Sequence, residues 1–195
     1  MTTDVRTLPW IAEATALLER VASTQAAAIE RASQWCADAI ASDGLVHLFG
    51  TGHSRIPVEE MFPRYGSYPG FNPMVELSMT FHTQVVGANG QRQAMFIERT
   101  PGLAEVILSN FRFGQMDVMI VFSSGGTTAV PVEIARGARA RGLRVIAVTS
   151  VEGSMAVEPD AATGGSRLLD EADLVIDLCT PVSYTHLTLP TTERV

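Results

Sequence analysis

Residues 118–148, VMIVFSSGGTTAVPVEIARGARARGLRVIAV, have the pattern of a complete strand–helix–strand unit. Its two ends, Val118–Phe122 and Leu143–Val148, are short apolar runs typical of buried strands. Between them, Ala129–Arg141 is predicted to be a helix, with Pro131 in its first turn. A strand, a helix and a second strand in this order predict a right-handed crossover between two parallel strands.

The same alternation of strands and helices continues on both sides of this unit. Leu45–Gly50 and Leu174–Leu178 are predicted strands, and a weaker one near Asn72–Leu77 is placed at a sheet edge because it contains Pro73. Further helices are predicted over roughly Val58–Phe62 and Pro101–Phe111. The alternation predicts an α/β fold, a three-layer αβα sandwich whose parallel sheet is covered on both faces.

The N-terminal segment, residues 1–44, carries no strand signal. Apolar residues recur at helical spacing from Trp10 to Ile40, which predicts a long helix, with a possible break near Ser23-Thr24. We expect this segment to pack on the domain or in a dimer interface and to carry no chemistry.

Composition excludes several classes of protein. The 195 residues are sufficient for one domain, and the 46% hydrophobic and 18% charged content is typical of a globular protein. A net charge of −7 without a basic cluster argues against nucleic-acid binding, and no apolar run approaches the roughly 20 residues that span a membrane. Met1–Thr7 lacks the apolar core of a signal peptide, and Cys36 and Cys179 lie far apart, so we expect a cytoplasmic protein with buried, reduced thiols.

The chain contains no lysine: all 14 of its Lys and Arg residues are arginine. This excludes Schiff-base chemistry, a pyridoxal-phosphate lysine and the lysine of a nucleotide-binding P-loop. We expect no cofactor. An anionic ligand would have to be held by backbone N–H groups, hydroxyls or arginine.

Two Ser/Thr/Gly loops carry the functional prediction. Loop one, Gly50–Ser54 (GTGHS), leaves a predicted strand and enters a helix, and loop two, Ser123–Thr128 (SSGGTT), does the same. If the strand order is 2-1-3-4-5, these loops meet where ligands bind doubly wound sheets, at the point where the order reverses. Glycines, helix N-termini and hydroxyls there suit a phosphate.

Other motifs for these loops fail on specific residues. A dinucleotide-binding loop requires a third glycine, but position 55 is Arg. A hydrolase nucleophile elbow requires Gly-x-Ser-x-Gly, but Ser54 is followed by Arg55 and Ile56.

On these loops, and on the segments PVEEMFPRYG, ERTPG and ADLVIDLCTP, the sequence resembles the sugar isomerase (SIS) family in its stand-alone, sugar isomerase-like branch. The resemblance runs from about Ala12 to Pro181 and implies a sugar-phosphate-binding domain over residues 45–181. It also implies a five-stranded, parallel, flavodoxin-like sheet in a protein that forms homodimers or homotetramers.

The family's phosphate loop, Ser-x-Ser-Gly-x-Thr, falls on Ser123, Gly125, Gly126 and Thr128, and its first-loop serine falls on Ser54. Gly125 departs from this pattern and removes one hydroxyl donor, which Ser124 could replace. The phosphate- and sugar-binding residues are therefore predicted to be Gly52, His53, Ser54, Ser123, Ser124, Gly125, Gly126 and Thr128.

Isomerisation of an aldose to a ketose through an enediol needs a base, for which we consider three residues. Glu98 is the first candidate, although it could instead cap the helix that begins near Pro101. His82 is the second, or a core histidine, and Glu60 the third, or part of a solvated face with Glu59. His47 is predicted to be a core residue, and the absence of ligand spacing argues against a metal.

The leading functional hypothesis is a phosphosugar isomerase that acts through an enediol. Two alternatives stay open: a non-catalytic sugar-phosphate-sensing module, and a lyase or etherase on the same fold.

The segment Val182–Val195, VSYTHLTLPTTERV, lacks a helical period and contains Pro190. We expect this segment to be a non-native tail, in place of a helix that would cover the strand Leu174–Leu178.

Overall fold

In the computed structural model, one sheet of five parallel strands has the order β2–β1–β3–β4–β5, which confirms the predicted fold. The structure describes residues 9–76, 79 and 90–181. The strands are β1 Val46–Gly50, β2 Phe71–Pro73, β3 Val118–Phe122, β4 Arg144–Thr149 and β5 Leu174–Asp177.

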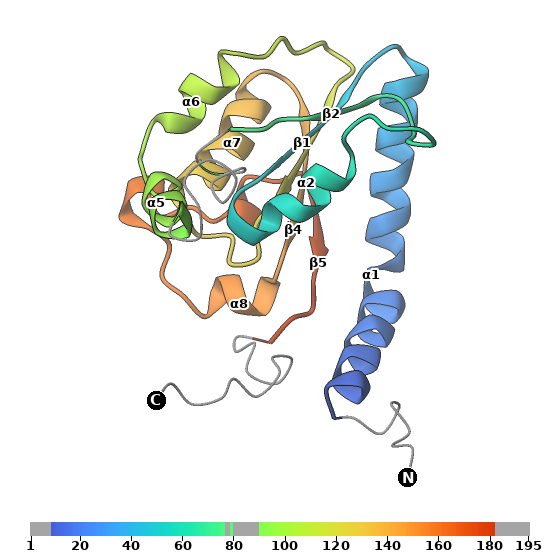
Figure 1. Cartoon of the computed structure of the whole chain (residues 1–195), viewed down its shortest axis with the longest axis vertical. Helices are drawn as coiled ribbons and strands as arrows, with labels where there is room; N and C mark the ends of the chain where they lie inside the picture. The colour runs from blue at the N-terminus through green and yellow to red at the C-terminus, as the bar shows by residue number, and fades with distance from the viewer. Residues whose placement is uncertain (1–8, 77–78, 80–89, 182–195) are drawn as a thin grey trace.

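Helices lie on both sides of this sheet, with α1 on one side and α6 and α7 on the other (Figure 1). The α-helices are α1 Pro9–Ala41, α2 Ile56–Glu60, α5 Gly90–Ile97, α6 Leu103–Leu108, α7 Ala129–Ala140 and α8 Val151–Met155. Short 3₁₀ helices are η2 Gly52–Arg55, η3 Ala161–Thr163 and η4 Leu168–Asp170. Among these described helices, none combines the length and hydropathy that crossing a bilayer requires.

The alternation of side chains along β3 divides the core into two layers. Met119 and Val121 are fully buried against α6 and α7, whereas Val118 and Ile120 pack against α1. Because successive strand residues point to opposite faces, one apolar run supplies both layers. The apolar character of the predicted strands therefore follows from helices covering both faces.

Helix α1 is continuous, so the break considered near Ser23-Thr24 is absent. The hydroxyls of Ser23 and Thr24 donate to the backbone carbonyls of Glu19 and Arg20, at 2.8 Å and 2.7 Å, which lets both residues stay in the helix. The helix is joined to β5 through Gln25, whose Oε1 accepts the backbone N–H of Asp177 at 3.0 Å.

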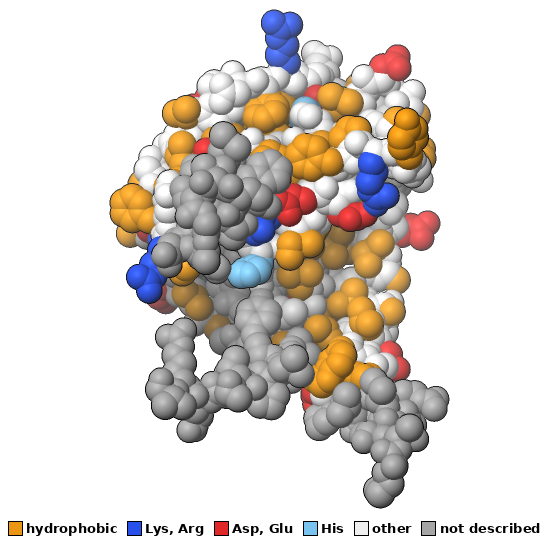
Figure 2. All heavy atoms as spheres, in the orientation of Figure 1, with side chains coloured by type: hydrophobic (Ala, Val, Ile, Leu, Met, Phe, Trp, Pro, Cys, Tyr) orange, Lys and Arg blue, Asp and Glu red, His pale blue; other side chains and the backbone are white. Residues whose placement is uncertain are grey.

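Apolar side chains stay exposed along α1. Leu18 is 69% exposed and Trp10 42%, and Figure 2 shows hydrophobic side chains along this helix. The described residues leave this surface uncovered. Involvement of α1 in a dimer interface stays a prediction.

Several predicted boundaries differ from the structure. Helix α6 is shorter than the predicted Pro101–Phe111, and β2 is shorter and earlier than Asn72–Leu77. Helix α5 was not predicted at all. The segment 182–195, expected to be a tail, lies outside the described residues.

The two cysteines are free, and they differ in burial. Cys179 is buried as predicted, whereas Cys36 on α1 is only half-buried. Burial nevertheless raises the pKa of the Cys36 thiol, which keeps the thiol in its neutral form.

Candidate functional site

The two loops follow the adjacent parallel strands β1 and β3 at the same edge of the sheet. Gly50, at the end of β1, pairs with Phe122, at the end of β3. The backbone N–H of Ser124 donates to Ser54 Oγ at 3.3 Å, so the loops are joined directly. This position is the point of reversal in the strand order, as expected from the sequence.

Glycine is required at two positions that shape these loops. A Cβ atom at Gly50 would lie 2.3 Å from the carbonyl oxygen of Ser54, so only glycine lets loop one turn back against β1. Gly126 has a φ of +62°, and a Cβ there would lie 2.7 Å from Thr149 Oγ1. Both loops are therefore more tightly constrained than a general glycine-rich turn.

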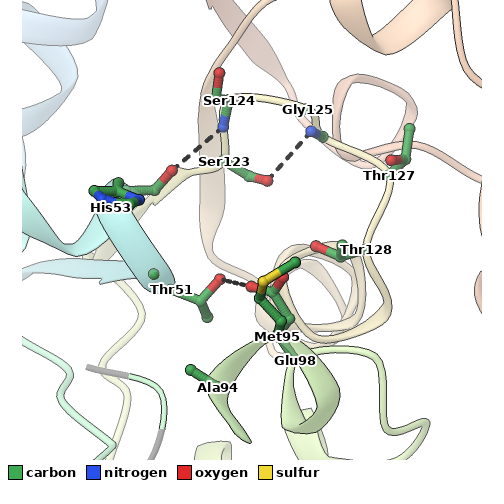
Figure 3. A pocket seen from close by; sticks show the side chains of 13 residues that line it. Thr51, His53, Ala94, Met95, Glu98, Ser123, Ser124, Gly125, Thr127 and Thr128 are labelled. Carbon is green, nitrogen blue, oxygen red and sulfur yellow. Dashed lines mark hydrogen bonds between the residues drawn. The ribbon is translucent and has the colours of Figure 1, made fainter. Parts of the chain in front are cut away.

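A cavity of about 260 Å³ opens between the loops and α5. Figure 3 shows Ser123, Ser124 and Gly125 on one side of it, with Thr51 and Glu98 opposite. All eight predicted binding residues line this cavity: Gly52, His53, Ser54, Ser123, Ser124, Gly125, Gly126 and Thr128. Thr51, Ala94, Met95, Glu98 and Thr127 complete the lining.

Two hydroxyls of loop two, those of Ser123 and Thr128, are placed to donate to a ligand. Ser123 Oγ accepts the backbone N–H of Gly126 at 3.2 Å, which leaves the O–H of Ser123 able to donate. Thr128 is the N-cap residue of α7, but its side chain makes no capping hydrogen bond. Together with the N-terminus of α7, these groups suit an anion.

The cavity contains little positive charge. His53 is exposed, and among the described residues that line the cavity it is the one side chain able to carry a positive charge. An anion here would be held mainly by neutral donors, as the absence of lysine predicted.

Glu98 follows α5 directly, and both its backbone carbonyl and its side chain accept hydrogen bonds. Its carbonyl oxygen accepts the N–H of Val130 in the first turn of α7, at 2.9 Å. Its Oε2 accepts the hydroxyl of Thr51 at 2.6 Å. The alternative role as a helix cap is wrong, because Gly102 is the N-cap of α6 and its N–H donates to Glu133 Oε2.

The other candidate bases have different positions. Glu60 on α2 is 66% exposed, forms an ion pair with Arg64 and does not line the cavity. Glu59 pairs with Arg55, whose Nη1 donates to the carbonyl of Gly52 at 2.8 Å and so supports loop one. His82 lies outside the described residues.

His47 is a core residue, as predicted. It is fully buried in β1, with its Nε2 2.8 Å from Asp117 Oδ2 and its Nδ1 2.9 Å from Asn72 Nδ2. Within the described part of the chain, no three His, Cys, Asp or Glu side chains lie close enough together to hold a metal ion.

The family model of the SIS domain matches residues 9–150, most of the chain. The chain belongs to the SIS domain family. The predicted resemblance is thereby confirmed.

Several curated relatives of this SIS domain are UPF0309 proteins. One from Listeria innocua is 35% identical over 161 residues, which are 83% of this chain and 62% of that protein. One from Streptomyces coelicolor is 33% identical over 177 residues, 90% of this chain and 68% of that protein. The chain thus spans about 62% of the length of the first of these relatives.

Solved structures agree on the fold. A phosphoheptose isomerase from Francisella tularensis has a TM-score of 0.64 at 14% identity, covering 96% of this chain and 90% of that one. The phosphoheptose isomerase of Neisseria gonorrhoeae has a TM-score of 0.59 at 16% identity, covering 90% and 88%. At these identities the similarity shows the fold alone.

Sequence reasoning missed four residues that line the cavity of this SIS domain: Thr51, Ala94, Met95 and Thr127. Thr51 and Thr127 lie inside the quoted loop motifs, so their positions were available from the sequence. Ala94 and Met95 belong to α5, and no sequence signal had placed that helix beside the loops.

Proposed function

We propose that this SIS domain binds a sugar phosphate with the phosphate between loops one and two, and interconverts its aldose and ketose forms through an enediol. The observation that carries the proposal is that Glu98 and both loops line one cavity. The loops supply donors for the phosphate, and Glu98 supplies a carboxylate for the sugar.

The proposed reaction assigns one role to each side of the cavity. The carboxylate of Glu98 removes the proton on C2 of the open-chain aldose while O1 takes up a proton, which gives an enediol. The proton is then returned to C1 while O2 gives up its own proton, which gives the ketose. Hydroxyl and backbone donors hold the phosphate, so the reacting carbons stay beside the carboxylate. His53, in the cavity, is a candidate for ring opening, and His82 stays the second candidate for the base.

Phosphoheptose isomerases are among the structural neighbours, so the substrate screen should include heptose phosphates beside hexose and pentose phosphates. Assembly as a homodimer or homotetramer in the cytoplasm also belongs to this proposal. It is consistent with the apolar side chains left exposed on α1.

The first test is thermal protection by paired sugars and sugar phosphates. Ligand at about 100 times its Kd adds roughly 2.7 kcal/mol to the free energy of unfolding. We expect this shift from the phosphate ester but not from the free sugar. Equal shifts from glucose and glucose 6-phosphate would contradict the phosphate site.

The second test separates binding from turnover. Glu98→Gln should retain sugar-phosphate binding and lose at least about a hundredfold in turnover. The matched control is Glu60→Gln, which removes an exposed carboxylate outside the cavity and should leave turnover unchanged. Binding without turnover by the wild-type protein would instead support a sensing module. Full activity of Glu98→Gln would exclude Glu98 as the base.

A further inference from the structure

We infer that Thr51 is a positioning residue that acts through Glu98: its hydroxyl fixes one carboxylate oxygen and leaves the other to move the substrate proton. This inference rests on the proposed function. It assigns a role in the reaction to a residue that sequence patterns had placed only inside a phosphate loop.

Thr51 is well suited to hold a neighbouring group in place. It lies between β1 and η2, is 7% exposed, and has an extended backbone with φ −119° and ψ 157°. A β-branched side chain on extended backbone has few accessible rotamers. The Oγ1 of Thr51 is therefore held in one direction, 2.6 Å from Glu98 Oε2.

The orientation of the Glu98 carboxylate depends on the donor from Thr51. Glu98 comes immediately after α5 and is half-buried. Among the hydrogen bonds of the described residues, the one from Thr51 is the only one to this carboxylate. A hydrogen bond to a carboxylate is stronger than one between neutral groups, so it orients the Glu98 side chain.

The hydrogen bond also connects the two halves of the cavity. The carbonyl of Thr51 accepts the N–H of Ser54 at 3.0 Å, and Ser54 in turn accepts the N–H of Ser124. The loop conformation that presents the phosphate donors therefore also fixes the direction of the Thr51 hydroxyl. Removing that hydroxyl should disturb the carboxylate while leaving the phosphate donors in place.

The experiment compares Thr51→Val, Thr51→Ser and Thr128→Val. Valine keeps the shape and branching of threonine but cannot donate, so we expect Thr51→Val to lower kcat about ten- to a hundredfold with KM changed less than about twofold. Thr51→Ser should restore most of the lost kcat. Thr128→Val should show the opposite split, with a raised KM.

Two further measurements extend this test, and the second of them, a crystal structure, does not depend on the proposed reaction. In a Glu98→Gln background, adding Thr51→Val should reduce the residual kcat no further, since both changes act on one group. A crystal structure of Thr51→Val should show the Glu98 carboxylate displaced from its wild-type position.

If the wild-type protein converts no sugar phosphate, the proposed function fails, and the crystal structure still decides whether Thr51 holds the carboxylate. An unmoved carboxylate in Thr51→Val, an unchanged kcat, or a Thr51→Ser variant as slow as Thr51→Val would overturn the inference.

Discussion

Two carboxylates at opposite ends of the sheet, Asp117 and Glu98, have different surroundings. Asp117 precedes β3, is 6% exposed and accepts three hydrogen bonds: from the N–H of Leu45 at 2.9 Å, the N–H of Gly114 at 2.7 Å and His47 Nε2 at 2.8 Å. Glu98 is half-buried beside a cavity and, from the residues that the structure describes, accepts one. Asp117 has its acceptor capacity used by the fold, whereas Glu98 keeps an oxygen for a ligand.

Burial and hydrogen bonding oppose each other at Asp117. Burial alone would raise its pKa, but the hydrogen bond from His47 and those from the backbone of Gly114 and Leu45 hold the pKa of this carboxyl below its ordinary value. Asn72 on β2 donates to the other ring nitrogen of His47, so the network joins β1, β2 and the start of β3. A perturbed carboxyl is thus explained here by structure, without a catalytic role.

The contrast between Asp117 and Glu98 should be clearest in the stability of variants at these two positions. Asp117→Ala removes the acceptor of these three hydrogen bonds and leaves their donors unpaired. The substitution should therefore lower the free energy of unfolding by about 3–5 kcal/mol. Glu98→Gln should lower it by less than about 1 kcal/mol, because that side chain borders a cavity. Urea denaturation of both variants measures the difference, and equal losses would remove the distinction between the two carboxylates.

The pH dependence of stability should also depend on Asp117. Because its pKa is lower in the folded than in the unfolded chain, its contribution is fully present above the ordinary value of 3.8 and is lost as the pH falls through the folded value. Urea denaturation between pH 3 and pH 7 should show a shallower acid loss for Asp117→Asn than for the wild type. Parallel curves would show that Asp117 carries none of this dependence.

The sequence predicted the sheet and both loops because those features depend on local patterns. The central strands β1, β3 and β4 have buried residues on both faces, and close backbone approach requires glycine in the loops. Helix α5 has eight residues and begins with the polar stretch Gly90–Gln93, so its periodicity was too weak to predict it. Its position depends on a contact between Glu98 and Val130, which are 32 positions apart.

Glu60 illustrates the same limit at the level of one side chain. Its spacing from loop one permitted it to point at the ligand, but α2 is only five residues long and directs Glu60 toward Arg64 and solvent. Spacing along the chain predicts which residues lie near a loop. It does not predict the direction of a side chain, because that direction depends on packing.

The hydroxyl of Thr128 is a donor at the cavity that the cap of α7 does not use. Thr128→Val keeps side-chain shape and removes a hydroxyl that makes no capping bond, so stability should be unchanged. Binding of the phosphate ester should weaken by roughly 1.5–3 kcal/mol, or about ten- to a hundredfold in Kd. The matched control is Thr15→Val on the exposed surface of α1, and calorimetric titration of both variants measures the effect.

A loss of stability in Thr128→Val, without a loss of affinity, would show that this hydroxyl belongs to the fold in the way that Asp117 does. Ser123→Ala should also weaken binding, but it is a less clean test. Its Oγ accepts the N–H of Gly126, so that variant changes loop two as well as the ligand contacts.

A smaller effect, a gain in affinity, is expected from a substitution at Gly125, where the phosphate loop of the SIS family has a serine. A Cβ atom at Gly125 would have Thr127 Oγ1 as its nearest neighbour, 4.0 Å away, so a side chain fits without displacing the loop. Gly125→Ser would add a hydroxyl donor to a cavity that lacks lysine and arginine among its described lining residues. We expect the Kd for a phosphate ester to fall on the order of tenfold, or less if ordering the new side chain offsets part of the hydrogen bond.

Gly125→Ala is the control, because it adds the same Cβ atom without a donor and should leave the Kd unchanged. Gly126→Ala should instead destabilise the loop, because its positive φ and the 2.7 Å approach to Thr149 Oγ1 exclude a side chain there. If Gly125→Ser and Gly125→Ala weakened binding equally, the space at position 125 would be occupied by the ligand itself. Glycine at position 125 would then serve to make space for the ligand. The phosphate contacts of loop two would have to come from its backbone and from Ser123 and Thr128.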